Sequence, residues 1–155
     1  MSDEIWRAAS PEDAPAIAAL TDAVYAKWVP VIGRKPLPMQ VDYAEAVSQH
    51  AFTLVERNGG LMGLIETEDQ PDHLYIVNVA VAESGQGQGL GRRLVAHAES
   101  QARARGFGEV RLMTNALYET NIRLYELLGY EIFARESFVN GVRVWMRKTI
   151  VSASG

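Results

Sequence analysis

The stretch from Leu74 to Arg105 limits most strongly what this chain can fold into. It starts with the apolar, β-branched run LYIVNVAVA (74–82), passes through ESGQGQGLG (83–91) and continues as RRLVAHAESQARAR. The first run is typical of a mostly buried strand, and the last carries apolar residues at helical spacing before Gly106. The sequence therefore predicts a strand that feeds a helix through a glycine-rich loop.

The loop has the features of a phosphate-binding turn. Glycines at 87, 89 and 91 remove the Cβ atoms that would keep a ligand away from the backbone. The loop N–H groups lie at a helix start, where the helix dipole favours anions. Similar glycine turns also serve merely to link a strand to a helix, so a connection without a ligand is the alternative.

Two common nucleotide motifs do not fit this loop. A Walker loop ends in Gly-Lys-Ser or Gly-Lys-Thr, whereas Gly91 is followed by Arg92 and Arg93. A dinucleotide fingerprint needs G-x-G-x-x-G, whereas the glycines here alternate. A nucleotide-binding module is therefore disfavoured.

The loop resembles instead the Q/R-x-x-G-x-G/A signature of the GNAT N-acetyltransferases, as Gln86-x-x-Gly89-x-Gly91. It departs from the family at its entry, where Glu83-Ser84-Gly85 replaces a frequent Pro-Glu-aromatic triplet. Gln86 stands where arginine is commoner in the family, and glutamine is an accepted variant there.

Composition narrows the class of protein. A chain of 155 residues with 48% hydrophobic content is sized for one domain, which we expect over 1–151 with a disordered tail at 152–155. No apolar run is long enough to span a membrane, and the N-terminus lacks the basic-then-apolar pattern of a signal peptide. The sequence therefore predicts a cytoplasmic protein without a membrane partner. A net charge of −4 argues against a nucleic-acid partner. The chain has no cysteine, and His50, His73 and His97 are scattered, which argues against a metal site.

The order of elements predicts an α/β fold with a mixed central sheet and helices on both faces. Strand-like runs cover 4–9, 51–57, 61–68, 74–82, 109–114, 130–135 and 142–148, and helical ones 10–28, 40–50, 90–105 and 119–128. Pro30 is expected to end the first helix, and 29–39 to form an ordered loop. Asn58-Gly59-Gly60 and Asn140-Gly141 predict hairpins, and strand-helix-strand over 74–114 predicts a parallel pair. This order resembles the GNAT fold over nearly the whole chain.

The resemblance implies a site for acetyl-CoA. In the family, the strand equivalent to 74–82 diverges from its parallel neighbour, so that the backbone of Val79, Ala80 and Val81 would pair with the pantetheine arm. The pyrophosphate would bind the amides of the loop, which comprises Gln86, Gly87, Gln88, Gly89, Leu90, Gly91 and Arg92. Arg92 could add positive charge.

A second motif, with Asn121, Tyr125, Gly129 and Tyr130, resembles the family's asparagine–tyrosine–glycine–aromatic segment. Asn121 and Tyr125 are four residues apart and so share a helix face. The resemblance implies that Asn121 steadies the cofactor or the diverging strands and that the Tyr125 hydroxyl protonates the coenzyme thiolate. The alternative for Tyr125 is a core aromatic.

The implied reaction is direct acetyl transfer to an amine, with no covalent enzyme intermediate. A primary amine with a pKa near ~10.4 is protonated at pH 7, so a base or a water chain is expected. No acid lies within 74–82, and Asn78 cannot act as one. Glu66 is the candidate base, with Glu68 and His73 behind it, and surface positions are the alternative for all three. The Val79 N–H would meet the oxyanion.

The resemblance implies that Tyr25, Trp28 and Tyr43 line the acceptor site, because they lie in the helices and loop that commonly wall the substrate cleft in the family. An aromatic wall suits an amine cation, so the acceptor is expected to be a small-molecule or peptide amine. Ordinary core packing is the alternative for Trp28 and Tyr43. A protein with the same fold that senses acyl-CoA without turnover is the competing function, motivated by the missing strand carboxylate. A monomer or homodimer is expected from the family.

Overall fold

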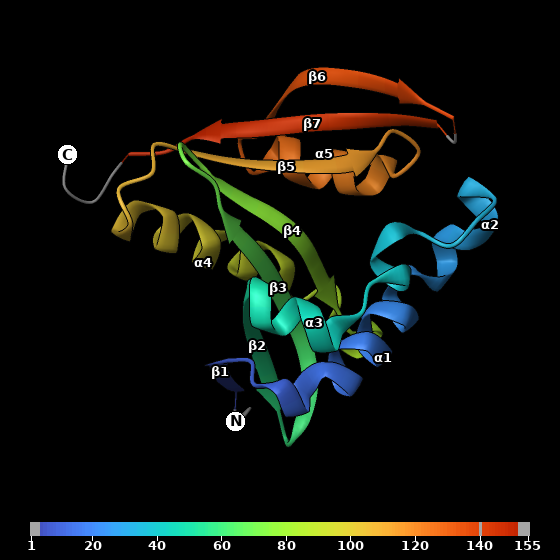
Figure 1. The fold of residues 1–155 in the computed structure, drawn as a ribbon, viewed down its shortest axis with the longest axis vertical. Coiled ribbons are helices and arrows are strands. Elements are labelled where there is room, and N and C mark those ends of the chain that lie inside the picture. The colour runs from blue at the N-terminus through green and yellow to red at the C-terminus, as the bar shows by residue number, and fades with distance from the viewer. Residues whose placement is uncertain (1–3, 140, 152–155) are drawn as a thin grey trace. The chain divides into compact units, whose positions relative to one another are not determined.

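The computed structural model describes residues 4–139 and 141–151 of the chain, and within them seven strands form one sheet (Figure 1). Their order is β1 (Glu4–Ala8), β2 (Ala51–Arg57), β3 (Gly60–Asp69), β4 (Leu74–Val81), β5 (Glu109–Asn115), β7 (Gly141–Thr149) and β6 (Glu131–Phe138). The α-helices are α1 (Ala14–Tyr25), α2 (Val29–Ile32), α3 (Tyr43–Gln49), α4 (Leu90–Ala104) and α5 (Glu119–Leu127). The predicted element order is confirmed, with α2 as an addition.

The chain divides into two compact units, which are described separately. The described residues of the first unit run to Glu68 and from Asn78 to Val95, and the second comprises Asp69–Val77 and the chain from Ala96. β4 and α4 run from one unit into the other. The tail predicted at 152–155 lies outside the described residues, and the single domain over 1–151 stays a prediction.

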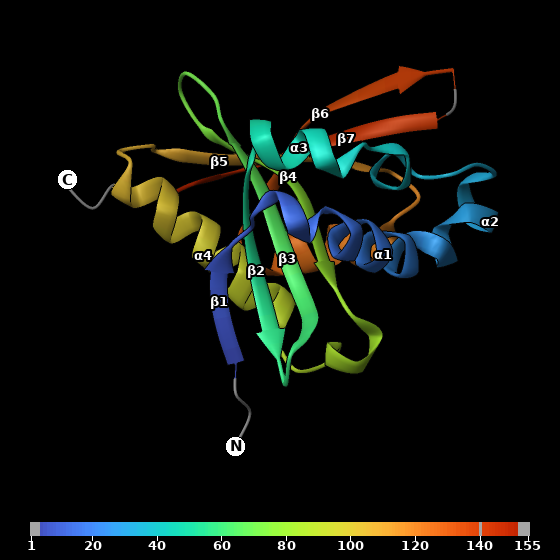
Figure 2. The same cartoon turned by 60° about the horizontal axis from the view of Figure 1, so that its bottom comes forward.

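In the first unit, β1, β2 and β3 lie side by side as antiparallel neighbours (Figure 2). The predicted hairpin between β2 and β3 is confirmed, since Arg57 pairs with Gly60 across the turn. Asn58 and Gly59 there have φ of 53° and 81°. Two successive positive φ angles match the strand twist of a tight hairpin, which is why asparagine and glycine occupy these positions.

The first helical segment starts as the sequence predicts. The Ser10 backbone N–H donates to the Asp13 carboxylate at 2.8 Å, which satisfies one of the donors that a helix start leaves open. The Asp13 carboxylate also binds Arg7 of β1 at 2.7 Å. The Asp13 carboxylate therefore both caps the helix start and attaches it to the strand before it.

The prediction that Pro30 ends this segment is wrong. After a 3₁₀ turn over Ala26–Trp28, the chain continues into α2, where Pro30 occupies the second position. A proline in the first turn costs no hydrogen bond, because its missing N–H would have no helical partner. Gly33, with φ of 75°, ends α2 instead, so the loop predicted over 29–39 is partly helical.

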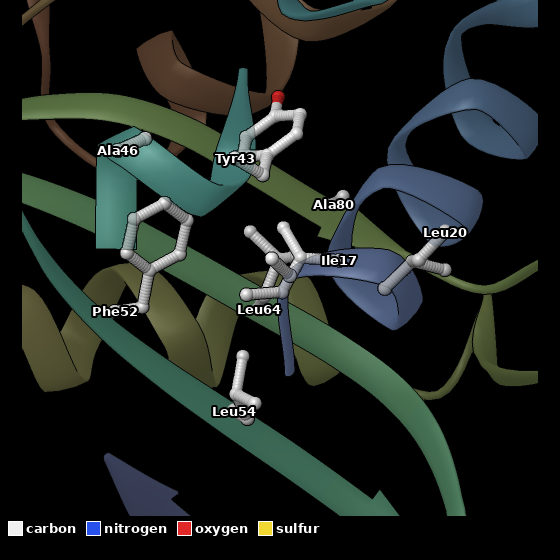
Figure 3. Close-up of a cluster of buried hydrophobic side chains, with 9 residues drawn as sticks. Ile17, Leu20, Tyr43, Ala46, Phe52, Leu54, Leu64 and Ala80 are labelled. Atoms are coloured by element: carbon white, nitrogen blue, oxygen red, sulfur yellow. The ribbon is translucent and has the colours of Figure 1, made fainter. Parts of the chain in front are cut away.

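The core of the first unit lies between the helices α1 and α3 and one face of β2, β3 and β4 (Figure 3). Its buried side chains are Ala14, Ile17, Leu20, Tyr43, Ala46, Phe52, Leu54, Leu64 and Ala80. Leu64 faces this cluster, so its neighbour Gly63 faces the other side of the sheet. There a Cβ on Gly63 would lie 3.0 Å from Leu90 of α4. The start of α4 thus packs closely on the opposite face, which confirms helices on both faces.

In the second unit, β5, β7 and β6 lie side by side and antiparallel (Figure 1). β4 and β5 form the predicted parallel pair, from Leu74 opposite Val110 to Ile76 opposite Leu112. Gly129 follows α5 with φ of 99°, as expected for a residue that stops a helix. In the second predicted hairpin Phe138 pairs with Gly141, while Asn140 lies outside the described residues.

Candidate active site

Two of the three loop glycines set the backbone of the turn after β4. Gly87 and Gly89 have φ of 80° and 78°, a region that residues with a Cβ rarely adopt. An added Cβ at either position would meet no atom within 4 Å. The space beside both glycines is therefore open, and conformation alone accounts for these two.

Gly91 needs a different explanation. It stands in the first turn of α4 without a positive φ, and an added Cβ would come no closer than 3.9 Å to Val81. Glycine inside a helix costs about 0.5 to 1 kcal/mol relative to alanine. Neither the chain's conformation nor its packing requires glycine here, so approach of a ligand to the Gly91 backbone stays a prediction.

The start of α4 leaves backbone N–H groups of this turn outside the helical ladder. The first bond into α4 runs from the Arg93 N–H to the Gly89 carbonyl at 3.1 Å, so the three N–H groups before it precede the helical ladder. Within 4–139 and 141–151, the loop and cap hydrogen bonds include none donated by the backbone of 87–92. Donors at the N-terminus of a 15-residue helix fit a phosphate group.

The Gln86 amide differs from the expected pattern. Its backbone N–H donates to the Glu83 carbonyl at 3.2 Å, so this N–H is not left for a ligand. Its side-chain Nε2 donates to the Val81 carbonyl at 3.1 Å. Gln86 therefore braces the turn against the end of β4, and one of the carbonyls expected to meet pantetheine already accepts a bond.

The two arginines after the loop have different surroundings. Arg93 binds Glu4 of β1 with nitrogen–oxygen distances of 2.5 and 3.1 Å, and its guanidinium lies 5.8 Å from the Trp6 ring centre. Arg92 is exposed and has no ion pair among the residues that the structure describes. Arg92 is thus the cation of this pair that remains available to an anion.

The residues predicted to wall the acceptor site lie in the first unit. The Tyr25 hydroxyl donates to Asn78 Oδ1 on β4 at 2.8 Å. Tyr43 is only 4% exposed, its hydroxyl donates to the Pro38 carbonyl at 2.7 Å, and its ring meets Phe52 edge-on. Trp28 is partly exposed. Tyr43 is therefore a core residue, which was the alternative to an acceptor role. For all three residues, contact with the acceptor stays a prediction.

Glu66 is buried, so the surface alternative is wrong for this residue. It is 2% exposed on β3, and its Oε2 lies 2.7 Å from His50 Nδ1. The other ring nitrogen of His50 lies 3.1 Å from Glu68. Burial raises the pKa of Glu66, and the contact with His50 opposes that rise. His73, the other candidate, contacts Asp72 at 2.7 Å.

Sequence reasoning missed His50 as a partner of these carboxylates. The signal that could have found it is the β2–β3 hairpin, whose pairing places Ala51 opposite Thr67 and so brings His50 beside the strand that carries Glu66 and Glu68. A bulge at Val55 and Glu56 shifts this register by one residue, which counting from the turn does not reveal.

In the second unit, Asn121 and Tyr125 lie one turn apart on α5 and are both partly exposed. The Tyr125 ring meets the Tyr130 ring edge-on, with centres 5.8 Å apart. Although Tyr125 as a whole is partly exposed, its hydroxyl is surrounded by protein, and this burial raises its pKa to about 12, so the hydroxyl keeps its proton at neutral pH. Such a group can donate a proton or a hydrogen bond but cannot serve as a base.

Two further findings concern classes of site. The residues that the structure describes contain no group of three or more His, Asp or Glu side chains placed to hold a metal ion. None of their helices is long and apolar enough to cross a membrane.

β4, whose residues alternate between buried and partly exposed, leads through a glycine turn into α4, as the resemblance to the acetyltransferases implies. The model of the acetyltransferase (GNAT) family matches residues 17–130, and the chain belongs to this family. The predicted family, fold class and enzyme class, an N-acetyltransferase, are thereby confirmed. Members of the family use acetyl-CoA as the acetyl donor.

Solved structures share the fold at low sequence identity. The ribosomal-protein-S18-alanine N-acetyltransferase of Escherichia coli is 22% identical, with a TM-score of 0.77 over 97% of this chain and 96% of its own. The PaiA N-acetyltransferase of Thermoplasma acidophilum, solved with coenzyme A, is 14% identical, with a TM-score of 0.80 over 96% and 99%. Ard1 of Thermoplasma volcanium is 17% identical, with a TM-score of 0.78 over 96% and 99%. No curated protein sequence matches the chain.

Proposed function

We propose that this protein transfers an acetyl group from acetyl-CoA directly to a primary amine of a small molecule or peptide. The observation that carries the proposal is the glycine turn, whose N–H groups at the start of α4 and open space beside Gly87 and Gly89 fit a pyrophosphate. A chain without cysteine has no thiol to form an acetyl-enzyme, which supports direct transfer. We further propose one domain over 1–151 that acts in the cytoplasm as a monomer or homodimer.

Donor binding is assigned to the backbone as much as to side chains. The amides from Gly87 to Arg92 would take the pyrophosphate, and the Arg92 guanidinium would add charge. The backbone of Val79 to Val81 would pair with the pantetheine arm as an added strand does. Asn121 is assigned to steadying the cofactor, from its place in the family motif. Acetyl-CoA, when bound, supplies the activated acetyl thioester.

The amine must lose a proton before it can attack. At pH 7 this costs ~4 to 5 kcal/mol for a primary amine with a pKa near ~10.4, unless a base accepts the proton. Glu66 is the proposed base, directly or through water. Burial raises the pKa of Glu66 and so strengthens its affinity for a proton, while the His50 contact opposes that rise. A perturbed carboxyl of this kind is typical of a functional group.

Two groups are proposed to stabilise the negative charges that develop on the oxyanion and on the thiolate during acetyl transfer. The Val79 N–H would bind the oxyanion of the tetrahedral state. The Tyr125 hydroxyl would give its proton to the departing thiolate. It carries that proton at neutral pH, but its raised pKa makes it a weaker acid than an ordinary tyrosine. Both assignments come from the family motif and are compatible with the local chemistry of each residue.

A thiol-release assay with acetyl-CoA over an amine library tests the proposal. We expect release that depends on one class of amine, and calorimetric binding of acetyl-CoA and CoA but not of ATP. Tight binding of acetyl-CoA with no turnover over the library would instead support an acyl-CoA sensor. That second function is favoured only by Asn78, which stands on β4 where some family members carry a glutamate.

A further inference from the structure

The Gln88 side chain is fixed from two sides although it lies between two glycines. Its Oε1 accepts a hydrogen bond from Arg57 at 2.8 Å, and its Nε2 donates to the Ser84 carbonyl at 3.3 Å. Gln88 carries the only side chain of the Gly87-Gln88-Gly89 turn. The most flexible part of the loop is therefore connected both to β2 and to its own entry.

Arg57 is held in turn by the first strand. Its guanidinium lies 3.0 Å from Glu4, and both side chains are only 17% exposed. Glu4 also binds Arg93 of α4 and accepts from the Trp6 indole at 2.8 Å. Hydrogen bonds from Arg93, Trp6 and Arg57 lower the pKa of Glu4 to about 2, so it stays ionised at neutral pH.

These contacts join four elements at one end of the first unit. The hairpin turn after β2 and the loop after β4 lie at that same end (Figure 2). Glu4 belongs to β1, Arg57 to β2, Gln88 to the loop and Arg93 to α4. The rigid hairpin and the helix start thus share one network with the glycine turn.

A glycine turn that is mobile before binding must be ordered by its ligand, which weakens affinity. We propose that Glu4, Arg57 and Gln88, here called the loop clamp, preorganise the amides of 87–92 for a pyrophosphate. Gln88 fixes the turn, Arg57 fixes Gln88, and Glu4 fixes Arg57. They are positioning residues, and the inference rests on the proposed function because it takes acetyl-CoA as the ligand.

The first test is the affinity for CoA, measured by calorimetry. Gln88→Ala removes the clamping side chain but keeps the backbone N–H, and Arg57→Gln removes its partner. We expect each to raise Kd about tenfold, equivalent to about 1.4 kcal/mol. The double variant should be no weaker than the weaker single variant, because both act through one contact. Unchanged affinities, or losses that add, would overturn the clamp.

The second test is the mobility of the turn, measured by ¹⁵N relaxation at Gly87, Gln88 and Gly89. In the wild-type protein without ligand we expect order parameters near ~0.85, and in Gln88→Ala values near or below ~0.6. Saturating CoA should restore the higher values in the variant. Equal order parameters in the two free proteins would show that the contacts do not fix the turn.

Arg7→Gln is the matched control. Arg7 links β1 to β2 through Glu56 and also binds Asp13, so it resembles Arg57 in type but contacts no loop residue. We expect it to lower stability and leave Kd unchanged, whereas an equal rise in Kd would mean general loosening and overturn the clamp. If wild-type protein failed to bind CoA, the proposed function would fall, while relaxation in the free protein would still test the clamp.

Discussion

His50 Nδ1 lies 2.7 Å from Glu66 Oε2, and Glu66 is almost completely buried on β3. The partners come from different elements, since His50 follows α3 directly. The ring's other nitrogen faces Glu68, whose side chain is 41% exposed, against 3% for that of Glu66. A buried carboxylate is thus connected through one imidazole to a carboxylate in contact with solvent.

Glu66→Gln should stabilise the protein at pH 7 and slow the reaction. The raised pKa of Glu66 means that the folded state binds the proton more tightly than the unfolded state. Stability is then greatest below the ordinary glutamate pKa near ~4.3 and falls as pH rises through the raised value. Glutamine avoids this fall. Denaturant unfolding of both proteins at pH 4 and 7 should show an advantage for the variant only at pH 7.

The effect of Glu66→Gln on the kinetics tests whether Glu66 acts as a general base or has only a structural role in the core. Loss of a general base should lower kcat/KM about 10²-fold or more. His50→Gln is the matched variant, because it keeps Glu66 but removes the neighbour that lowers its pKa. The acid limb of its kcat/KM profile should move to higher pH. Wild-type profiles in both variants would leave Glu66 without a catalytic role.

Gly91→Ala should leave the fold as stable or more stable by about 0.5 to 1 kcal/mol and should weaken CoA binding. The first effect follows because an added Cβ would come no closer than 3.9 Å to Val81, which is an ordinary contact, and the second from a methyl group between the ligand and the amides. Gly91→Glu should abolish CoA binding without unfolding the protein, because its carboxylate would oppose the pyrophosphate. Thermal unfolding and calorimetry measure the two effects.

Gly108→Ala is the control for that pair of variants. Gly108 has no positive φ and has open space around it, but it lies before β5 and outside the loop. Its CoA affinity should equal that of the wild type. Gly89→Asp should also abolish binding, but its positive φ adds backbone strain, so Gly91 gives the cleaner test. Wild-type affinity in folded Gly91→Glu would contradict the phosphate site.

The sequence predicted those parts of the fold that depend on residues close together in the chain. The Asn58-Gly59 turn, the Ser10 helix start and the strand–loop–helix unit all depend on residues close in sequence. Pro30 misled because a proline stops a helix from within but is tolerated in its first turn. The loop clamp depends on contacts of Glu4 with Arg57 and Arg93, which are far from it in sequence. The position of Glu66 relative to His50 depends on the β2–β3 register, which a bulge shifts. Such long-range contacts have no signature in a single sequence.

Trp28→Ala should raise the KM for the acceptor amine and leave the acetyl-CoA affinity within about twofold, or ~0.4 kcal/mol. Trp28 is partly exposed, and the Lys27 ammonium lies 5.3 Å from its ring centre, so the ring already accepts a cation on its face. Steady-state kinetics with each substrate varied in turn measure the split. Equal losses for both substrates would assign Trp28 to packing.

Tyr125→Phe should slow the chemical step while the fold keeps its stability. The variant retains the ring that meets Tyr130, and it removes only the hydroxyl, whose high pKa keeps it protonated at neutral pH. Loss of a general acid is worth about 10²- to 10⁴-fold, or roughly 3 to 5 kcal/mol. The effect should fall on kcat more than on acetyl-CoA affinity, and it should shrink for thioesters whose thiolate leaves without a proton.

Tyr130→Phe is the matched control, because it removes a neighbouring hydroxyl that donates to Glu99 at 2.9 Å. Its loss should appear in the free energy of unfolding, at about 1.5 to 3 kcal/mol for a hydrogen bond to a carboxylate, and not in kcat. Single-turnover kinetics establish that chemistry limits the rate in each protein. If Tyr125→Phe then turns over the best amine at the wild-type rate, Tyr125 is a packing residue, and the thiolate takes its proton from water.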